Sequence, residues 1–358
     1  MSSKLDWLNN LASSEIKYNL GAGVPPIDQY PNFNPGKLFG FENLSSNDES
    51  INYHSTTGYI NETAARFLYE EEGIEFDSKN ILITNGVQEA ISLAIACFKN
   101  KTLACIDPVY PGFEDAARLF NCKLNKFPLK NWLKNLETLE EGSLFYLSSD
   151  FSNPLGYTLT LNERKQLVEL SVKNKFYIFD DATYRPFFLD KKLPPLISFN
   201  QKNIIHAFSF SKILAPGLRT AFIFLPKELS SKFTNIKSNL SLNNSGITQK
   251  IVKQWLIENN YSLTNHLAKF KNRLNENRKI TRKFNLNYEG GFFSTIQINH
   301  KADFDFCNSL LMKEQIATIP FSLFTENKKF ENHLRICISN IDFNDLSLVL
   351  KIIKNFTP

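Results

Sequence analysis

The sequence predicts an α/β protein: a large domain built in three layers around a mostly parallel sheet, followed by a smaller α+β domain at the C-terminus. Between about residue 80 and residue 225, short apolar runs alternate with helical segments, which is typical of βαβ units whose sheet is covered on both faces. After Pro226 the pattern changes to a long helical stretch and a few isolated strands. We therefore expect an N-terminal arm over 1–44, a large domain over 45–235 and a small domain over 236–358.

Strands of the large domain are expected where an apolar run is short and lacks helical spacing. These runs lie at 81–83, 103–106, 144–147, 176–179, 204–210 and 221–225. Helical patterns separate several of them, at 90–95, 114–120 and 162–172. Because ligands of such sheets bind at the carboxyl ends of the strands, polar residues directly after these runs are the candidates for a site.

The regions outside the large domain have weaker patterns. Leu5, Leu8 and Leu11 have the spacing of a short amphipathic helix, and the stretch 21–43, rich in Pro, Gly and Asn, predicts no regular structure. For the small domain we expect strands and helices in the order helix 248–284, strand 292–298, helix 304–313, strand 334–338 and a final helix containing Leu346 and Ile353.

Composition and charge exclude several classes of protein. Hydrophobic residues make up 42% and charged residues 22%, as in folded rather than disordered chains. The net charge of +5 is spread along the chain, whereas a nucleic-acid binder gathers it into a basic stripe. No apolar run has the length of a membrane span or the position of a signal peptide, and the five cysteines lack zinc-type spacing. We expect a cytoplasmic protein with reduced thiols and without a metal, nucleic-acid or membrane partner.

The segment with the most chemical information runs from Ser209 to Arg219 and reads SFSKILAPGLR. Lys212 lies at the end of an expected buried strand, where burying an ammonium group is unfavourable. Taken alone, Ser-Lys at a strand end is more often a surface lysine. Arg219, however, offers a planar fork to an anion nearby, and this combination suits a Schiff base to a phosphorylated aldehyde cofactor.

This segment resembles the lysine signature of fold-type I pyridoxal-phosphate enzymes in the aminotransferase class I/II family. The resemblance is strongest to the branch with the aromatic and 2-aminoadipate aminotransferases, and further motifs follow in the family's order over nearly the whole chain. It implies pyridoxal 5'-phosphate as cofactor, bound as an internal aldimine on Lys212, with Ser209, Ser211 and Arg219 as cofactor contacts.

A phosphate site is expected between the strand 81–83 and the following helix, at Gly86, Val87 and Gln88. Amide groups at a helix N-terminus point toward an anion, and the helix dipole favours its negative charge. The family usually has a hydroxyl residue where Val87 stands, so here the contacts are expected from the backbone amide and from Gln88.

Asp180 and Asp181 follow another expected strand, and carboxylates buried there need a cationic partner. The resemblance assigns Asp181, three residues before Tyr184, to the protonated pyridine nitrogen of the cofactor, and Tyr184 to its phenolic oxygen. Asn153, in an Asn-Pro-Leu-Gly turn, is assigned to the same oxygen, and Tyr110 to stacking on the ring. Asp180 is then expected to point away, because side chains alternate along a strand.

Arg335 lies on an expected apolar strand of the small domain, where a guanidinium needs an anion. A structural ion pair is one alternative; the resemblance implies a bidentate contact with the substrate α-carboxylate. Asn153 and Gly23 are expected on the same substrate side. Tyr18, Phe292 and Phe293 could border that pocket or belong to the core, and Phe321 stands where relatives commonly have glycine.

Tyr53 precedes Gly58 as in the family motif whose tyrosine crosses a dimer interface to the phosphate, although Thr63-Ala64 stands where the family usually has Leu-Arg. This implies a homodimer with composite sites.

The catalytic residues implied are Lys212, Asp181 and Tyr184, in an aminotransferase that moves an amino group between an L-amino acid and a 2-oxo acid. The same residues also support elimination, decarboxylation, cyclisation or oxidation, so a specialised biosynthetic enzyme of this fold is the alternative. A ligand-sensing domain of a transcription regulator is a further alternative, although no helix-turn-helix pattern occurs before residue 20.

Overall fold

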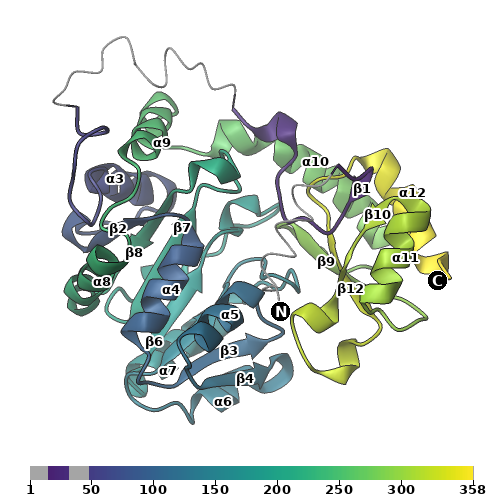
Figure 1. The fold of residues 1–358 in the computed structure, drawn as a ribbon, viewed down its shortest axis with the longest axis horizontal. Coiled ribbons are helices and arrows are strands. Elements are labelled where there is room, and N and C mark those ends of the chain that lie inside the picture. The colour runs from purple at the N-terminus through teal and green to yellow at the C-terminus, as the bar shows by residue number, and fades with distance from the viewer. Residues whose placement is uncertain (1–14, 32–47, 358) are drawn as a thin grey trace.

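The computed structural model describes residues 15–31 and 48–357, and its larger part is built around a seven-stranded sheet (Figure 1). The strands are β2 (Ile81–Thr84), β3 (Leu103–Asp107), β4 (Leu124–Pro128), β5 (Leu144–Leu147), β6 (Tyr177–Asp181), β7 (Ile204–Ser209) and β8 (Ala221–Phe224). They lie in the order β2-β8-β7-β6-β5-β3-β4, and all run parallel except β8, which is antiparallel to β2 and β7. The predicted α/β fold with a mostly parallel sheet is confirmed.

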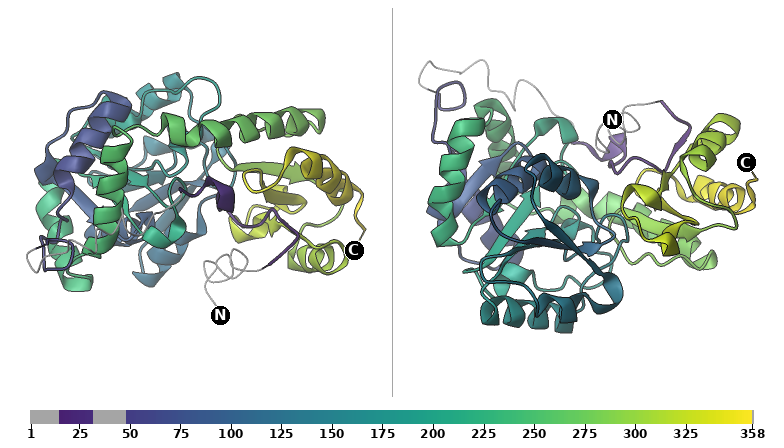
Figure 2. Two further views of the ribbon diagram at one scale, coloured as in Figure 1. Left: turned by 90° about the horizontal axis from the view of Figure 1, so that it is seen from above. Right: turned by 60° about the horizontal axis from the view of Figure 1, so that its bottom comes forward.

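Helices cover both faces of this sheet, which gives three layers (Figures 1 and 2). One face is covered by α4 (Val87–Cys97), α5 (Pro111–Leu119) and α8 (Lys227–Leu240), and the other by α3 (Asn61–Glu72), α6 (Trp132–Leu136) and α7 (Leu161–Lys173). The strands are buried on both sides, so alternate residues of one strand enter different cores: Ile178 packs with α7, whereas Phe179 packs on the α4 side.

A smaller sheet follows, formed by β9 (Phe293–Gln297), β11 (Ile319–Pro320) and β12 (His333–Cys337) in the antiparallel order β11-β12-β9. Its core includes residues of α11 (Phe304–Glu314) and α12 (Phe343–Asn355). The segment before the large domain also belongs here, because β1 (Tyr18–Asn19) pairs in parallel with β10 (Ile316–Ala317). This pairing places the loop after β1 next to the large sheet.

The structure corrects one expected helix. The pattern over 248–284 forms two helices, α9 (Gly246–Glu258) and α10 (Thr264–Lys283). Asn260 and Tyr261 between them have positive φ angles of 50° and 58°, a conformation that no helix continues through. The helices α3, α6 and α8 and the strands β1, β4, β10 and β11 were not expected from the sequence. The predicted elements other than 248–284 differ from the observed ones mainly at their ends. The expected helix at Leu5–Leu11 lies outside the described residues.

The expected boundary at 235/236 falls inside α8, which packs on α4. Residues of α9, including Trp255, belong to the core of the large sheet. Along α10, Phe270 packs in that same core and Ile280 in the core of the small sheet, and Figure 1 shows this helix running from one part to the other. We therefore propose that the division between the domains lies within α10.

Within residues 15–31 and 48–357, no helix is both long and apolar enough to cross a membrane. In the same ranges, no group of three or more His, Cys, Asp or Glu side chains is arranged to bind a metal ion. The five cysteines are free thiols, and all except Cys122 are buried.

Candidate active site

A cavity of about 440 Å³ lies where the carboxyl ends of the large sheet's strands meet the small sheet and the loop after β1. It is lined by all the residues predicted for the site except Gly86 and Tyr53: Gly23, Val87, Gln88, Tyr110, Asn153, Asp181, Tyr184, Ser209, Ser211, Lys212, Arg219 and Arg335. Most of them follow a strand of the large sheet, as expected for ligand sites of such sheets. Gly23 and Arg335 come from the arm and the small domain.

Lys212 follows β7 and points into this cavity. Its Nζ donates a hydrogen bond to the carbonyl oxygen of Gly23 at 2.6 Å. Burial lowers the pKa of Lys212 to about 8, and the positive charges of Arg219 and Arg335 act in the same direction. A primary amine whose pKa is lowered in this way is a nucleophile and a base close to neutral pH.

At one end of the cavity, α4 begins at Val87, directly after Gly86. Gly86 has a φ of +77°, and a Cβ there would lie 2.6 Å from Nη2 of Arg219, so only glycine fits. Arg219 donates to the carbonyl oxygen of Asn85 at 3.0 Å and to Oγ of Ser211 at 3.4 Å. A helix N-terminus and a guanidinium thus face the same space, which suits a phosphate group.

Gln88 contributes less directly than expected. Its Nε2 donates to the carbonyl oxygen of Gly112 at 3.0 Å, while Oε1 has no hydrogen-bond partner. Oγ of Ser209 accepts from the backbone N–H of Ser211 at 3.2 Å, which fixes the turn before Lys212.

Asp181 ends β6 and is buried on the cavity side. Its carboxylate accepts hydrogen bonds from the Tyr146 hydroxyl at 2.9 Å and from the hydroxyl and N–H of Thr183 at 2.6 and 3.1 Å. Burial nevertheless raises the pKa of Asp181. This carboxylate has no cation bonded to it in the described part of the chain, and a cationic ligand group would restore its usual ionisation.

Asp180 points to the opposite face of the sheet, as expected from strand alternation. Its carboxylate forms a hydrogen bond with Nδ1 of His206 at 3.1 Å and accepts from the N–H of Ser149 at 3.2 Å. Although burial acts to raise the pKa of Asp180, the hydrogen bond and charge of His206 lower it.

Arg335 on β12 is the buried cation of the opposite wall. One Nη donates to Oδ1 of Asn153 at 3.1 Å, the other donates to the carbonyl oxygen of Gly21, and Nε has no partner. The guanidinium lies over the rings of Phe293 and Phe324, at 4.4 and 5.2 Å. Burial lowers the pKa of Arg335 to about 10, and among the described residues no carboxylate pairs with it. An anion is therefore the ligand this wall can bind.

Tyr53 and Phe321, both discussed above for their relation to the site, do not line the cavity. Tyr53 is 88% exposed on the surface. Phe321 is fully buried but stacks on Phe330 at 5.1 Å, outside the cavity, so the bulky residue at this position does not narrow it. Of the three aromatic residues with an open assignment, Phe293 lines the cavity, whereas Tyr18 and Phe292 do not.

Sequence reasoning missed several lining residues, namely Val24, Tyr30, Tyr146, Ser148, Thr183 and Pro216. Tyr146 on β5 could have been found: β5 neighbours β6, so a tyrosine near its carboxyl end comes close to Asp181. Tyr30 had no such signal, because only the docking of the arm brings it here.

A family model described as "Aminotransferase class I and II" matches residues 11–353. Among curated relatives, an uncharacterised helix-turn-helix transcriptional regulator of Bacillus subtilis is 27% identical over 56% of this chain, but the match spans only 45% of the regulator. A 2-aminoadipate transaminase of Thermus thermophilus is 24% identical over 90% of this chain and 86% of its own length.

The fold has solved counterparts. One is the alpha-aminoadipate aminotransferase LysN of Thermus thermophilus, solved with N-(5'-phosphopyridoxyl)-L-leucine. It superposes with a TM-score of 0.85 at 21% identity and covers 99% of this chain and 94% of its own. At this identity the likeness shows the fold.

Proposed function

The chain belongs to the aminotransferase class I and II family, and we propose that it uses pyridoxal 5'-phosphate bound at Lys212 to transfer amino groups between L-amino acids and 2-oxo acids. The observation that supports this most is the convergence of Lys212, Asp181, Arg219 and Arg335 on one cavity from three separate chain segments. Among the described residues, each of these charged groups lacks a counter-charge that the cofactor or an amino acid would supply.

The residues present fit this cofactor. The N-terminus of α4 and Arg219 would hold its phosphate, in the space that a Cβ at Gly86 would restrict. Asp181 would hold the proton on the pyridine nitrogen, and that cationic nitrogen would stabilise the buried carboxylate. Tyr110, Tyr184 and Asn153 border the remaining space and would contact the ring there.

When bound, pyridoxal phosphate supplies an electron sink for the charge that develops at the substrate α carbon. Lys212 removes the proton at that carbon and returns it, which its lowered pKa permits near neutral pH. Arg335 binds the α-carboxylate, and the carbonyl oxygen of Gly21 and Oδ1 of Asn153 fix the plane of its guanidinium. Holding the substrate at its carboxylate orients the C–H bond toward Lys212.

We further propose a homodimer in which Tyr53 reaches the partner's phosphate site. The segment 50–54 packs on the α8–α9 connection: His54 Nε2 lies 3.0 Å from the carbonyl oxygen of Asn244. Exposed apolar side chains occur on the segment 50–54, on this connection and at the adjoining ends of α8 and α9, namely Ile51, Tyr53, Leu240, Leu242 and Ile247. Several exposed apolar side chains on neighbouring segments support a contact with a second copy.

The decisive experiment incubates the holoenzyme with a panel of L-amino acids and 2-oxo acids and identifies the products. Transamination yields a new 2-oxo acid and a new amino acid in equal amounts. Ammonia, carbon dioxide or peroxide as product would instead identify the lyase, decarboxylase or oxidase alternative and overturn the proposal. A Lys212→Ala variant is the control, and it should neither turn over nor retain cofactor after borohydride reduction.

The dimer has its own test. Inactive Lys212→Ala and Tyr53→Ala proteins are mixed under conditions where subunits exchange. If Tyr53 acts in the partner's site, each heterodimer has one undamaged site and activity recovers. No recovery after proven exchange contradicts the shared site.

A further inference from the structure

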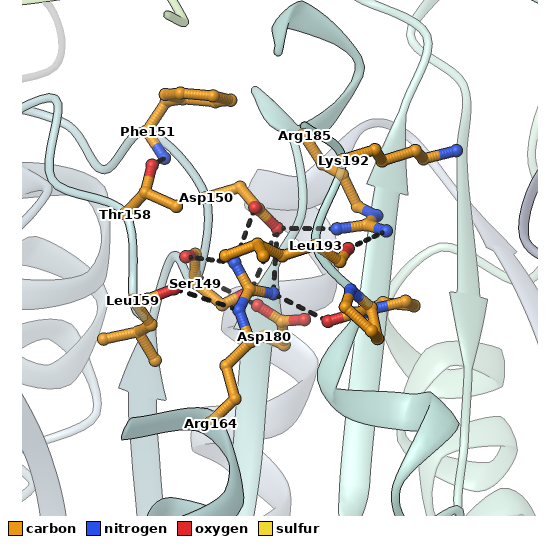
Figure 3. Close-up of polar contacts among 12 residues, drawn as sticks. Ser149, Asp150, Phe151, Thr158, Leu159, Arg164, Asp180, Arg185, Lys192 and Leu193 are labelled. Atoms are coloured by element: carbon orange, nitrogen blue, oxygen red, sulfur yellow. Dashed lines mark hydrogen bonds and ion pairs between the residues drawn. The ribbon is translucent and has the colours of Figure 1, made fainter. Parts of the chain in front are cut away.

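A buried ion network lies on the other face of β6, outside the cavity (Figure 3). We call the residues Glu72, Asp150, Arg164, Arg185 and Lys192 the ion network. Its centre is fully enclosed, because Asp150, Arg164 and Arg185 are exposed by only 4%, 0% and 2%. Figure 3 shows the carboxylate of Asp150 between the two guanidinium groups, 2.6 Å from Arg164 and 3.0 Å from Arg185.

Both guanidinium groups hold loops next to the active site, and Arg164 also donates to the carbonyl oxygen of Pro194 at 3.1 Å. Arg164 donates to the carbonyl oxygens of Ser149 and Leu159 at 2.9 and 3.1 Å, which closes the base of the loop 149–159. Arg185 directly follows Tyr184 in the chain and donates to the carbonyl oxygen of Leu193 at 2.8 Å. Arg164 thus connects the loop 149–159 to the segment 193–194, and Asp150 joins the loop 149–159 directly to Arg185, the residue after Tyr184.

Both loops reach the wall of the cavity that contains Arg335. Oδ1 of Asn153, at the tip of the first loop, accepts a hydrogen bond from Arg335 at 3.1 Å. The ring of Tyr184 packs against Phe293 at 5.1 Å, and Phe293 in turn lies under the guanidinium of Arg335. A shift of either loop would thus change the orientation of the Arg335 guanidinium.

We propose that Asp150 is a positioning residue, which sets the placement of Asn153 and Tyr184 and through them the recognition of the substrate carboxylate. For the ligand that these residues bind, this inference rests on the proposed function. Glu72 provides a matched control, since it accepts two hydrogen bonds from Arg185 at 2.8 Å but has no contact with the loop 149–159.

The first experiment needs no cofactor. Hydrogen exchange is measured in the cofactor-free full-length protein for wild type, Asp150→Asn and Glu72→Gln. Asp150→Asn should accelerate exchange in both 149–159 and 182–188, whereas Glu72→Gln should leave 149–159 at the wild-type rate. Equal exchange of 149–159 in all three proteins, or equal acceleration in both variants, overturns the proposal.

The second experiment uses the holoenzyme. Asp150→Asn should raise KM for the amino acid about tenfold and shift the pH at which the absorption band of the bound cofactor changes, while kcat falls much less. Glu72→Gln should lower thermal stability but leave KM and the band unchanged. If Asp150→Asn does not fold, Asp150→Glu, which keeps the charge and displaces the carboxylate, replaces it in both experiments. Absence of transamination in the wild type refutes the proposed function, and the exchange experiment still decides the positioning role.

Discussion

The cavity and the ion network are both buried and rich in charge, yet their charges are balanced in opposite ways. In the ion network each charge has an opposite partner, so the hydrogen bond from Arg185 lowers the pKa of Glu72 although burial acts to raise it. In the cavity each pKa shifts toward the uncharged form of its group. Burial lowers the pKa of Lys212 to about 8 and that of Arg335 to about 10, and it raises that of Asp181.

The difference separates a structural role from a binding role. Two arginines, Arg185 and Arg335, are equally buried, each 2% exposed. Arg185 is bound by two carboxylates. Burial acts to lower the pKa of Arg185, but Glu72 and Asp150 raise it by more, so the net shift is upward. Arg335 has only neutral acceptors. A buried charge that the protein leaves without its counter-charge is unfavourable unless a ligand completes it.

The adjacent aspartates provide the largest expected effect. Asp181→Asn removes the carboxylate of the cavity and should lower kcat on the order of a thousandfold while some cofactor still binds. Asp180→Asn removes the partner of His206 and should lower the midpoint of urea unfolding with a much smaller loss of kcat. Steady-state kinetics and unfolding of both variants check this; a larger kcat loss in Asp180→Asn would mean that the two residues have been assigned to the wrong faces.

The second pair of variants replaces each buried arginine with methionine in the cofactor-free protein. Arg185→Met removes a cation that Glu72 and Asp150 share, which leaves Asp150 with Arg164 and Glu72 with Lys192, and it should lower the free energy of unfolding by about 1–3 kcal/mol. Arg335→Met leaves no carboxylate of the described residues without its cation, so the free energy of unfolding should stay the same or rise. Urea titrations measure both values. An equal loss of unfolding free energy in the two variants would contradict the distinction between a structural Arg185 and a ligand-binding Arg335.

Arg335→Lys keeps the charge but loses the planar fork. It should weaken amino-acid binding tenfold to a thousandfold, or about 1.4–4 kcal/mol, because an ammonium cannot contact both carboxylate oxygens. The absorption spectrum of the cofactor on Lys212 should be unchanged. Substrate titrations followed at the cofactor band measure the affinity; normal affinity together with lost cofactor would make Arg335 structural.

The smallest effect concerns pH. The pKa of Lys212 falls from 10.5 to about 8 on folding, so the unfolded chain binds more protons between these values and stability rises with pH across this window. Lys212→Met lacks this dependence. In the cofactor-free protein the variant should therefore be more stable than wild type below about pH 8, and its advantage should disappear as the pH approaches 10.5. Thermal unfolding at several pH values tests this, and a constant difference would contradict it.

The large sheet could be predicted because its strands are buried on both faces and appear as continuous apolar runs. Elements with mixed polarity were not found: β4 reads LNKFP and α8 reads KELSSKFTNIKSNL, and both have one face in water. The single helix expected over 248–284 is two helices because Asn260 and Tyr261 take a left-handed conformation. The residues around them contain no Gly or Pro that would predict a break there.

The sequence by itself determined which side chains belong to the site wherever the constraint is local. Lys212 follows a strand, Gly86 precedes a helix, and Asp181 and Asp180 point to opposite faces because strand residues alternate. What only the tertiary structure decided is which groups meet and which charges stay without a partner. Arg335 and Gly21 are brought together when β1 joins the small domain, and Asp150 reaches Arg185 from a different loop. Burial and counter-charge depend on contacts between segments far apart in the chain, and those contacts distinguish the binding arginine from the structural one.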